Sequence, residues 1–290
     1  MLLPEFIREG AATLEALYPP KEARSLVLRL CSEVLGTESY THIVEPKYEI
    51  PAEKLTVLQD NMKRLADGEP LQYVLGYQEF LGRRFHVAPG VLIPRPETEL
   101  LVADAIARCY VRPLIDSSNQ GPRVLDLCTG SGCIAWSIAL EVPGAIVTGV
   151  DISKSALEIA SSQFSGVAPR FVKADVLQLP EEFDGAPFDL ITANPPYIRE
   201  SEKAAMHRNV LEHEPGLALF VPDDDALRFY RAIALWAQRF LKTGGSCIVE
   251  INEALGDETV LLFEAAGFKE VKKHADFFGK DRFVSFKKAA

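Results

Sequence analysis

The chain has 290 residues, 48% hydrophobic and 25% charged, which is the composition of a globular protein with one large domain or two. Its 31 Lys and Arg residues and 41 Asp and Glu residues give a formal net charge of -10. A chain this acidic repels phosphate backbones unless it has a local basic patch, and its cations occur only singly or in short pairs. Nucleic acid is therefore a disfavoured partner.

Other simple features of the sequence point to a cytoplasmic protein. The spacing of the five cysteines fits neither a zinc site nor a redox pair, which is typical of free thiols in a reducing compartment. Charges interrupt every apolar run, so no membrane span is expected. The first residues lack a basic region followed by a long apolar run, so no signal peptide is expected either. The histidines show no ligand spacing, and we interpret His207 and His213 as surface residues rather than a metal site. We expect a cytoplasmic monomer without a metal.

The first 75 residues have the periodicity of helices. Apolar positions recur at helical spacing before Pro19-Pro20, again from Ala23 to Val34, and again after Pro51. Gly36 and Gly68 are natural helix ends, and Pro51 suits a first helical turn. We predict a small helical bundle over residues 1–75.

Residues 76–100 predict a hairpin and a linker. Positions 77 to 87 resemble two short strands that turn at Gly82, and a helix opens after Pro94 and runs to about Arg108. The polar segment 112–122 predicts a surface loop.

From Arg123 onward, apolar strand-like runs alternate with helical segments. The predicted strands lie near 124–127, 145–150, 170–172, 188–192 and 247–251, and two more close together after Gly267 suggest a terminal antiparallel hairpin. Such alternation is typical of an α/β fold, a mostly parallel sheet with helices on both faces. We predict this domain over residues 101–290.

The first of these strands runs into a glycine loop, Asp126-Leu127-Cys128-Thr129-Gly130-Ser131-Gly132. Glycines let a backbone turn sharply and approach a ligand. Asp151 follows the next strand, 21 positions after Gly130, where a carboxylate can accept hydrogen bonds from ribose hydroxyls. The pattern predicts a nucleoside site at the carboxyl ends of parallel strands.

Two cofactors fit this loop, a nicotinamide dinucleotide and S-adenosylmethionine. Asp126 favours the second, because a carboxylate here suits a sulfonium and would repel a pyrophosphate. Asp175, in Lys173-Ala174-Asp175-Val176, could accept a hydrogen bond from the adenine amino group, or it could simply cap a turn.

The fourth strand runs into Asn194-Pro195-Pro196-Tyr197, beside the expected cofactor crevice. An amide nitrogen is a poor nucleophile because its lone pair is delocalised. Two fixed acceptors, the Asn194 side-chain oxygen and the Pro195 carbonyl, could hold its N–H groups and stabilise the charge that develops on nitrogen. The prolines would fix these carbonyls, and Tyr197 would offer a flat stacking face. The segment predicts methylation of a planar amide or amine nitrogen.

Several further stretches resemble the release factor glutamine methyltransferases, bacterial enzymes that methylate the glutamine amide in a Gly-Gly-Gln tripeptide of peptide chain release factors. The resemblance covers nearly the whole chain. It rests on Gly68-Glu69-Pro70-Leu71-Gln72-Tyr73, Gly76, Phe80, Gly82, Val91-Leu92-Ile93-Pro94-Arg95-Pro96-Glu97-Thr98-Glu99, Glu214-Pro215, Ala218-Leu219 and Gly279-Lys280-Asp281-Arg282-Phe283.

The resemblance implies a class I methyltransferase fold, a Rossmann-like sheet of seven strands, preceded by a helical domain that docks the release factor. It implies that Cys128 to Gly132, Asp151, Asp175-Val176 and Asn194 contact S-adenosylmethionine. It also implies that Asn194 to Tyr197 hold the glutamine and that Arg95, Pro96 and Glu97 lie near the pocket. Cys128 stands where the family usually has glycine, and Glu250-Ile251-Asn252-Glu253 replaces the usual Glu-hydrophobic-Gly.

Two alternatives remain open. A nucleic-acid adenine methyltransferase can use the same tetrapeptide on a flipped base, although the acidic balance disfavours it. A nucleoside-binding adaptor without activity would share the fold, because a fold does not prove an activity.

Overall fold

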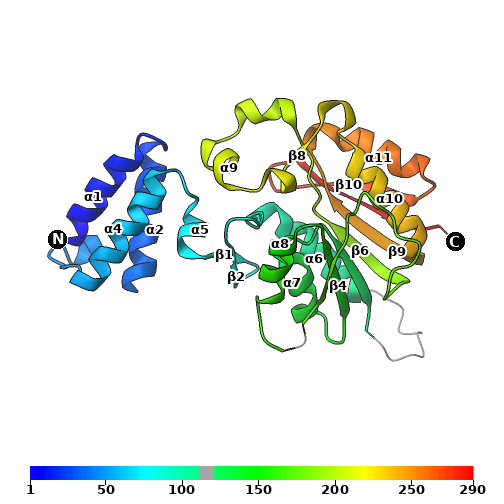
Figure 1. Cartoon of the computed structure of the whole chain (residues 1–290), viewed down its shortest axis with the longest axis horizontal. Helices are drawn as coiled ribbons and strands as arrows, with labels where there is room; N and C mark the ends of the chain where they lie inside the picture. The colour runs from blue at the N-terminus through cyan, green and yellow to red at the C-terminus, as the bar shows by residue number, and fades with distance from the viewer. Residues whose placement is uncertain (111–120, 167, 290) are drawn as a thin grey trace. The chain divides into compact units, whose positions relative to one another are not determined.

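The computed structural model describes residues 1–110, 121–166 and 168–289 (Figure 1). The polar loop expected at 112–122 falls outside the described residues except for its last two positions. The chain divides into two compact units. The first comprises Met1–Tyr77 and Met206–His213, and the second comprises Gln78–Ala205 and Glu214–Ala290.

The first unit is helical, as the sequence predicted. Pro20 starts α2 at a position where a missing N–H costs nothing, and Gly36, at φ 69°, ends it in the left-handed conformation. Fully buried side chains such as Leu14, Leu30 and Leu58 form its core. Its helices are α1 (Leu3–Leu14), α2 (Pro20–Leu35), α3 (Thr41–Val44), α4 (Ala52–Ala66), α5 (Leu71–Leu75) and α9 (Arg208–His213).

The segment 206–213 belongs to this unit although it lies far along the chain. The His207 ring stacks on Tyr18 with ring centroids 5.1 Å apart, and His207 Nε2 lies 3.2 Å from the Leu17 carbonyl oxygen. His207 stacks on Tyr18 and is still exposed, which agrees with the surface position expected from the sequence.

The second unit contains the predicted sheet of seven strands in the order β10-β11-β9-β6-β3-β4-β5. Neighbours among β9, β6, β3, β4 and β5 pair in parallel, and β11 pairs antiparallel with both β9 and β10. The strands are β3 (Arg123–Leu127), β4 (Ile146–Asp151), β5 (Arg170–Lys173), β6 (Phe188–Ala193), β9 (Leu241–Glu250), β10 (Lys269–Ala275) and β11 (Asp281–Lys287). The predicted terminal hairpin and the fold class are confirmed.

Helices cover both faces of the sheet (Figure 1). They are α6 (Pro96–Tyr110), α7 (Cys133–Glu141), α8 (Lys154–Ser161), α10 (Arg228–Phe240) and α11 (Gly256–Ala265). Smaller elements are two pairs of short strands, β1 (Tyr77–Phe80) with β2 (Arg83–His86) and β7 (Ile198–Arg199) with β8 (Phe220–Val221), and the 3-10 turns η1 (Glu200–Ala205), η2 (Gly216–Ala218), η3 (Asp223–Asp225) and η4 (Glu253–Leu255).

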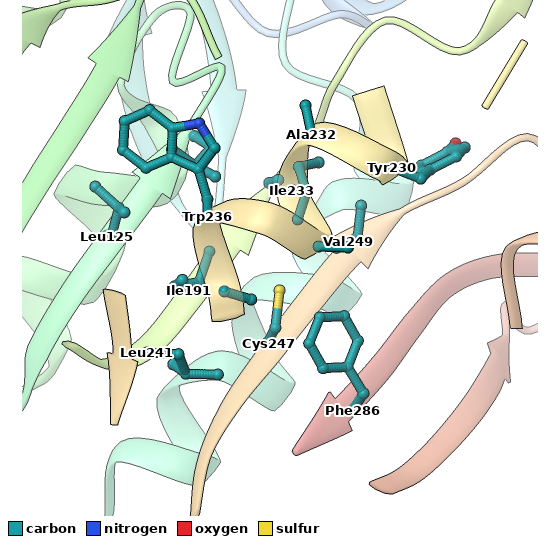
Figure 2. Packing of buried hydrophobic residues seen from close by; sticks show 14 of the residues in the cluster. Leu125, Ile191, Tyr230, Ala232, Ile233, Trp236, Leu241, Cys247, Val249 and Phe286 are labelled. Carbon is teal, nitrogen blue, oxygen red and sulfur yellow. The ribbon is translucent and has the colours of Figure 1, made fainter. Parts of the chain in front are cut away.

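The apolar residues of each strand alternate between two cores. Leu125, Ile191 and Val249 point to the face that α10 and α11 cover, where Trp236 is fully buried (Figure 2). Val124, Leu190 and Ile248 point to the face that α6 and α7 cover. This two-sided burial explains why the strands appear as continuous apolar runs in the sequence.

Parallel pairing brings the carboxyl ends of the central strands to one edge of the sheet. The register pairs Leu127 with both Val150 and Ala193, and Ala193 with Val249. The glycine loop, Asp151, Asn194 and Glu250 therefore follow or end neighbouring strands at the same edge, where α/β sheets bind ligands. Among the described helices, none combines the length and apolar character needed to cross a membrane.

Candidate active site at the carboxyl edge of the sheet

A cavity within the second unit lies at this edge of the sheet. It is lined by the loop after β3, by the ends of β4, β5 and β6, and by the segments 90–98 and 215–218. Most of the residues predicted from the sequence line it: Arg95, Cys128, Thr129, Gly130, Ser131, Asp151, Asp175, Val176, Asn194 and Pro196. The structure thus brings together residues that lie about 100 positions apart.

The glycine loop needs its glycines for two different reasons. Gly130 lines the cavity at φ 54°, and a Cβ there would project into open space. Gly132, at φ 79°, starts α7 and does not line the cavity. A Cβ at Gly132 would come within 3.0–3.1 Å of Ala160, Phe171 and Trp136. Gly130 therefore keeps ligand space open, whereas Gly132 permits close helix packing.

Cys128 occupies a left-handed backbone conformation, at φ 58°. A residue other than glycine is strained there, which gives a physical reason for the glycine that the family resemblance led us to expect. Burial raises the pKa of the Cys128 thiol well above its ordinary value, and nearby Asp151, Asp126 and Asp175 raise it further. The thiol therefore stays neutral and lines the cavity as a small apolar group.

Asp126 and Asp151 have different positions relative to the cavity. Asp126 is fully buried beneath the loop, where it accepts hydrogen bonds from Thr129 Oγ1 at 2.5 Å and from Thr192 Oγ1 at 2.8 Å. Burial raises the pKa of Asp126 to about 7. It does not line the cavity, so it supports the loop rather than touching a ligand.

Asp151 lines the cavity and also fixes the loop. Its Oδ2 accepts from the Gly130 N–H and its Oδ1 from the Ser153 N–H, both at 2.9 Å. Each carboxylate oxygen has a second lone pair, so hydroxyl groups of a ribose can still be bound. Burial raises the pKa of Asp151, although these backbone donors oppose the shift.

Asp175 caps a turn, which is one of the two roles that the sequence allowed, and it also lines the cavity. Its carboxylate accepts from the Leu177 N–H and from Gln178 Nε2, which makes it a turn-capping residue. It also lines the cavity beside Val176, whose carbonyl accepts from the buried Trp236 indole at 2.9 Å. The turn after β5 is thereby anchored to α10.

The side chain of Asn194 is held by a chain of hydrogen bonds. Asn194 Nδ2 donates to Thr98 Oγ1 at 3.2 Å, and Thr98 Oγ1 donates to Glu250 Oε2 at 2.7 Å. Glu250 is fully buried at the end of β9, and Thr98 lies in the first turn of α6. These two hydrogen bonds link the loop after β6, the start of α6 and the end of β9, which are distant in the sequence.

The hydrogen bonds from Asn194 through Thr98 to Glu250 run in a defined direction. A hydroxyl has one proton, and the carboxylate of Glu250 can only accept, so the Thr98 proton points to Glu250. The Thr98 oxygen must then accept from Asn194, which turns the Asn194 amide nitrogen toward Thr98. The Asn194 carbonyl oxygen is left on the other side of the amide group, available as an acceptor at the cavity.

Tyr197 plays a different part from the expected stacking face. Its ring packs against the core that α10 covers and does not line the cavity. Its hydroxyl donates to Glu250 Oε1 at 3.0 Å, and burial raises its pKa well above the ordinary value. Tyr197 therefore anchors the loop. The prediction that its ring offers a stacking face in the cavity was wrong. Phe229 of α10 is an aromatic side chain that does line it.

Asn252, at the position where the resemblance led us to expect glycine, also anchors this loop. Its Nδ2 donates to the Tyr197 carbonyl at 3.2 Å and to Glu202 at 2.9 Å, and its Oδ1 accepts from the Ala254 N–H. Its φ is -68°, a conformation that needs no glycine. The departure from the family pattern thus adds contacts to the Asn194–Tyr197 segment.

The predicted segment Arg95 to Glu97 contributes unequally. Arg95 lines the cavity and is fixed by Glu214, whose Oε1 lies 2.5 Å from Arg95 Nη2 and whose side chain is only 1% exposed. Pro96 and Glu97 begin α6 and do not line the cavity. Pro195 is buried in the loop and does not line it either.

Several residues of the site were missed from sequence. Thr98 lies one position beyond the predicted segment, and its role depends on Glu250, 152 residues away. A buried acid that ends a strand is a signal that could have singled out Glu250. Pro215 and Ala218, noted only for the family resemblance, line the cavity, whereas no sequence signal marks Leu217 or Phe229.

The electrostatics of the cavity suit a cationic ligand. Asp151 and Asp175 line it, and Arg95 is paired with Glu214. A pyrophosphate would meet these carboxylates unfavourably, whereas a sulfonium would not. Within the described residues, no group of three or more His, Cys, Asp or Glu side chains could hold a metal ion. The sheet order and this site define a class I S-adenosylmethionine-dependent methyltransferase.

Comparisons with known proteins identify the family. A model described as a methyltransferase domain matches residues 124–213, and one described as the PrmC N-terminal domain matches residues 5–76. A release factor glutamine methyltransferase of Bacteroides thetaiotaomicron is 41% identical over 282 residues, covering 97% of each chain. One of Flavobacterium psychrophilum is 37% identical over 286 residues, covering 98% of each chain.

Among solved structures, a protein-(glutamine-N5) methyltransferase (release factor-specific) from Alicyclobacillus acidocaldarius is 31% identical to the chain. Its TM-score is 0.42, and the match covers 71% of this chain and 100% of the other. The two near full-length relatives settle the family. The chain belongs to the release factor glutamine methyltransferases.

Proposed function

We propose that the chain methylates the side-chain amide nitrogen of the glutamine in the Gly-Gly-Gln motif of peptide chain release factors. The observation that carries the proposal is the orientation of Asn194, whose amide nitrogen is held by Thr98. The relatives that cover almost the whole chain bear the name of this activity.

The cofactor half of the cavity would bind S-adenosylmethionine through the predicted residues. Asp151 would accept hydrogen bonds from the ribose hydroxyls, and Asp175 with Val176 would contact the adenine. The backbone of the glycine loop from Cys128 to Ser131 would lie against the cofactor. When bound, S-adenosylmethionine supplies a methyl group on a positively charged sulfur, which keeps the bonding electron pair when the methyl group leaves.

The acceptor half would hold the glutamine. Asn194 Oδ1, at the cavity, would accept one N–H group of the amide, which helps to turn the nitrogen lone pair toward the methyl group. We propose that the Pro195 carbonyl accepts the second N–H group, although Pro195 does not line the cavity. As the N–C bond forms, these fixed oxygens stabilise the positive charge on nitrogen. One proton then leaves the nitrogen for solvent, because neither acceptor can keep it. Pro196 and Tyr197 would keep the loop rigid, and Arg95 would border the pocket, whereas Pro96 and Glu97 only begin the adjacent helix α6.

We propose that residues 1–75 dock the release factor, with 76–100 as a connecting segment and 101–290 as the catalytic domain. The net charge of -10 supports an enzyme that does not bind nucleic acid directly. We further propose that it works as a cytoplasmic monomer.

The experiment is a methylation assay with labelled S-adenosylmethionine and a release factor purified from cells that lack the modification. We expect one methyl group, located by tandem mass spectrometry on the glutamine of the Gly-Gly-Gln motif. A release factor with that glutamine changed to asparagine is the matched control and should stay unlabelled. Absence of label on the natural factor, or label on DNA or RNA instead, would contradict the proposal.

A further inference from the structure

The turn between β10 and β11 exposes two adjacent phenylalanines. Phe277 is 91% exposed and Phe278 is 90% exposed, and they are the two most exposed of the large hydrophobic side chains in the described part of the chain. Solvated aromatic rings side by side are unfavourable unless a partner covers them, and aromatic residues are enriched in the cores of interfaces.

The turn is a built structure rather than a loose end. Asp276 Oδ1 accepts from the N–H groups of Phe278 and Lys280, and Asp276 Oδ2 accepts from Arg282 Nε at 2.8 Å. The Asp276 N–H donates to the Lys280 carbonyl, and Gly279 takes φ 77°. These bonds fix the backbone that presents the two rings, so little conformational freedom of the backbone is lost when a partner binds.

The turn lies at the same edge of the sheet as the candidate active site. Because β11 runs antiparallel to β9, its first residues pair with the end of β9, with Phe283 opposite Glu250. The Ile251 N–H donates to the Arg282 carbonyl at 2.9 Å. The next residue, Asn252, donates to the Tyr197 carbonyl, so a short run of contacts connects the turn to the Asn194–Tyr197 segment.

The charges around the turn favour a protein partner. Lys280 and Arg282 both lie near Glu253, and Arg282 also pairs with Asp276. Lys273 is paired with Asp257 and Asp281. Paired cations have little to offer a phosphate backbone or an anionic lipid surface, so the apolar rings are the main contact that this turn presents.

We propose that Phe277 and Phe278 are a docking surface for the protein substrate, where they contact an apolar patch beside the target glutamine. This inference rests on the proposed function. A glutamine that enters the cavity brings its surrounding protein surface to this edge, and binding energy from such remote contacts helps to position the reacting group. A short peptide around the glutamine would lack that surface.

The test compares a double variant, Phe277→Ser with Phe278→Ser, against wild type on two substrates, a full-length release factor and a short peptide containing Gly-Gly-Gln. We expect the KM for the full-length factor to rise roughly tenfold, equivalent to about 1.4 kcal/mol. The kcat and the KM for the peptide should change much less. Leu261→Ser, at a side chain on α11 that is 63% exposed, is the matched control and should resemble wild type.

Thermal unfolding and S-adenosylhomocysteine affinity check that the double variant is folded. The weaker variant Asp276→Ala, which loosens the turn but keeps both rings, should raise the same KM to a smaller extent. An unchanged KM for the full-length factor in the folded double variant would overturn the inference, and so would an equal rise for the peptide. A wild-type dimer that the double variant converts to monomer, with KM unchanged, would assign the surface to a second copy of the chain instead. If wild type methylates neither substrate, the proposed function fails and the inference with it.

Discussion

The two halves of the cavity are constructed in different ways. In the proposed cofactor half, the glycine loop and Asp175 follow parallel strands and Asp151 ends one, so the sheet brings them to the same edge. In the acceptor half, Asn194 also follows a strand, but its amide is oriented by Thr98 and Glu250 from other segments. Main-chain geometry thus shapes one half, whereas a buried side-chain network shapes the other.

The difference predicts which kinetic or binding constant a substitution in each half should change. A substitution in the cofactor half should weaken cofactor binding, because the contacts of that half to the cofactor already form in the ground state. A change in the acceptor half should lower kcat, because its acceptors matter most when charge develops on nitrogen. A single substitution that both raises the cofactor Kd and lowers kcat would contradict this separation between the two halves.

The largest effect is expected for Asn194→Ala. Removal of one preorganised group that stabilises transition-state charge typically costs about 10²–10³-fold in kcat. Cofactor affinity should change only modestly, because Asp151 and the glycine loop remain. Single-turnover kinetics together with calorimetric titration of the cofactor separate the two quantities. Wild-type turnover in this variant would reject the role proposed for Asn194.

Glu250→Gln should have the next largest effect. Glutamine offers one acceptor and one donor, whereas Thr98 and Tyr197 both donate to Glu250. If the glutamine donates to Thr98, the Thr98 proton turns toward Asn194 and favours the flipped amide. We expect kcat to fall roughly 10–100-fold, the range for a lost hydrogen bond to a charged group, with the fold retained. The exposed Glu258→Gln is the control and should behave as wild type.

The same carboxylate predicts a pH dependence. Burial raises the pKa of Glu250, and the hydroxyls of Thr98 and Tyr197 only partly offset this. The ionised form is the one that orients Asn194, so kcat should fall as pH falls through this raised pKa. The acid limb should flatten in Glu250→Gln. A kcat profile recorded from about pH 5 to 8 in both proteins tests this, and identical limbs would speak against it.

In the cofactor half, Asp151→Asn should act on affinity. The amide keeps only one acceptor, so a bond to the Gly130 or Ser153 N–H or to the ribose is lost. We expect the cofactor Kd to rise about tenfold, with kcat at saturation nearly unchanged. Titration calorimetry measures the Kd, and Asp257→Asn, at an exposed carboxylate, is the control. A fall in kcat at unchanged Kd would contradict the division.

Cys128→Gly should have the smallest effect. Glycine relieves the strain at φ 58° but loses side-chain packing and adds freedom to the unfolded chain. These terms oppose each other, so the free energy of unfolding should change by less than about 1 kcal/mol. Cys128→Val, with a branched side chain in the same conformation, should be clearly destabilising. Chemical denaturation of both variants measures the contrast, and equal stabilities would refute the strain argument.

The same contrast explains what the sequence could predict. Apolar residues at helical spacing predicted the first unit, and burial on both faces of the central strands left the continuous apolar runs that predicted the sheet. The terminal hairpin was predicted from two short strand-like runs that lie close together after Gly267. The glycine loop and Asp151 were predictable because the loop follows one strand and Asp151 ends the next. The role of Thr98 was not, because its one essential partner lies 152 residues away and no local pattern encodes such a pair.

Two local interpretations also show this limit. Tyr197 was expected to present a stacking face, but its hydroxyl bonds to the buried Glu250, which turns the ring into an anchor. Asp126 was expected near the cofactor's positive charge, but two threonine hydroxyls hold it beneath the loop. In both cases a partner from elsewhere in the chain decided the direction of the side chain.

The most direct test of the oriented-amide account is the kcat of Thr98→Val compared with that of Thr98→Ser. Valine has nearly the shape of threonine but no hydroxyl, whereas serine keeps the hydroxyl and loses only a methyl group. The account predicts that Thr98→Ser stays close to wild type and that Thr98→Val loses about tenfold or more in kcat at unchanged cofactor Kd. Equal kcat values for the two variants would contradict it.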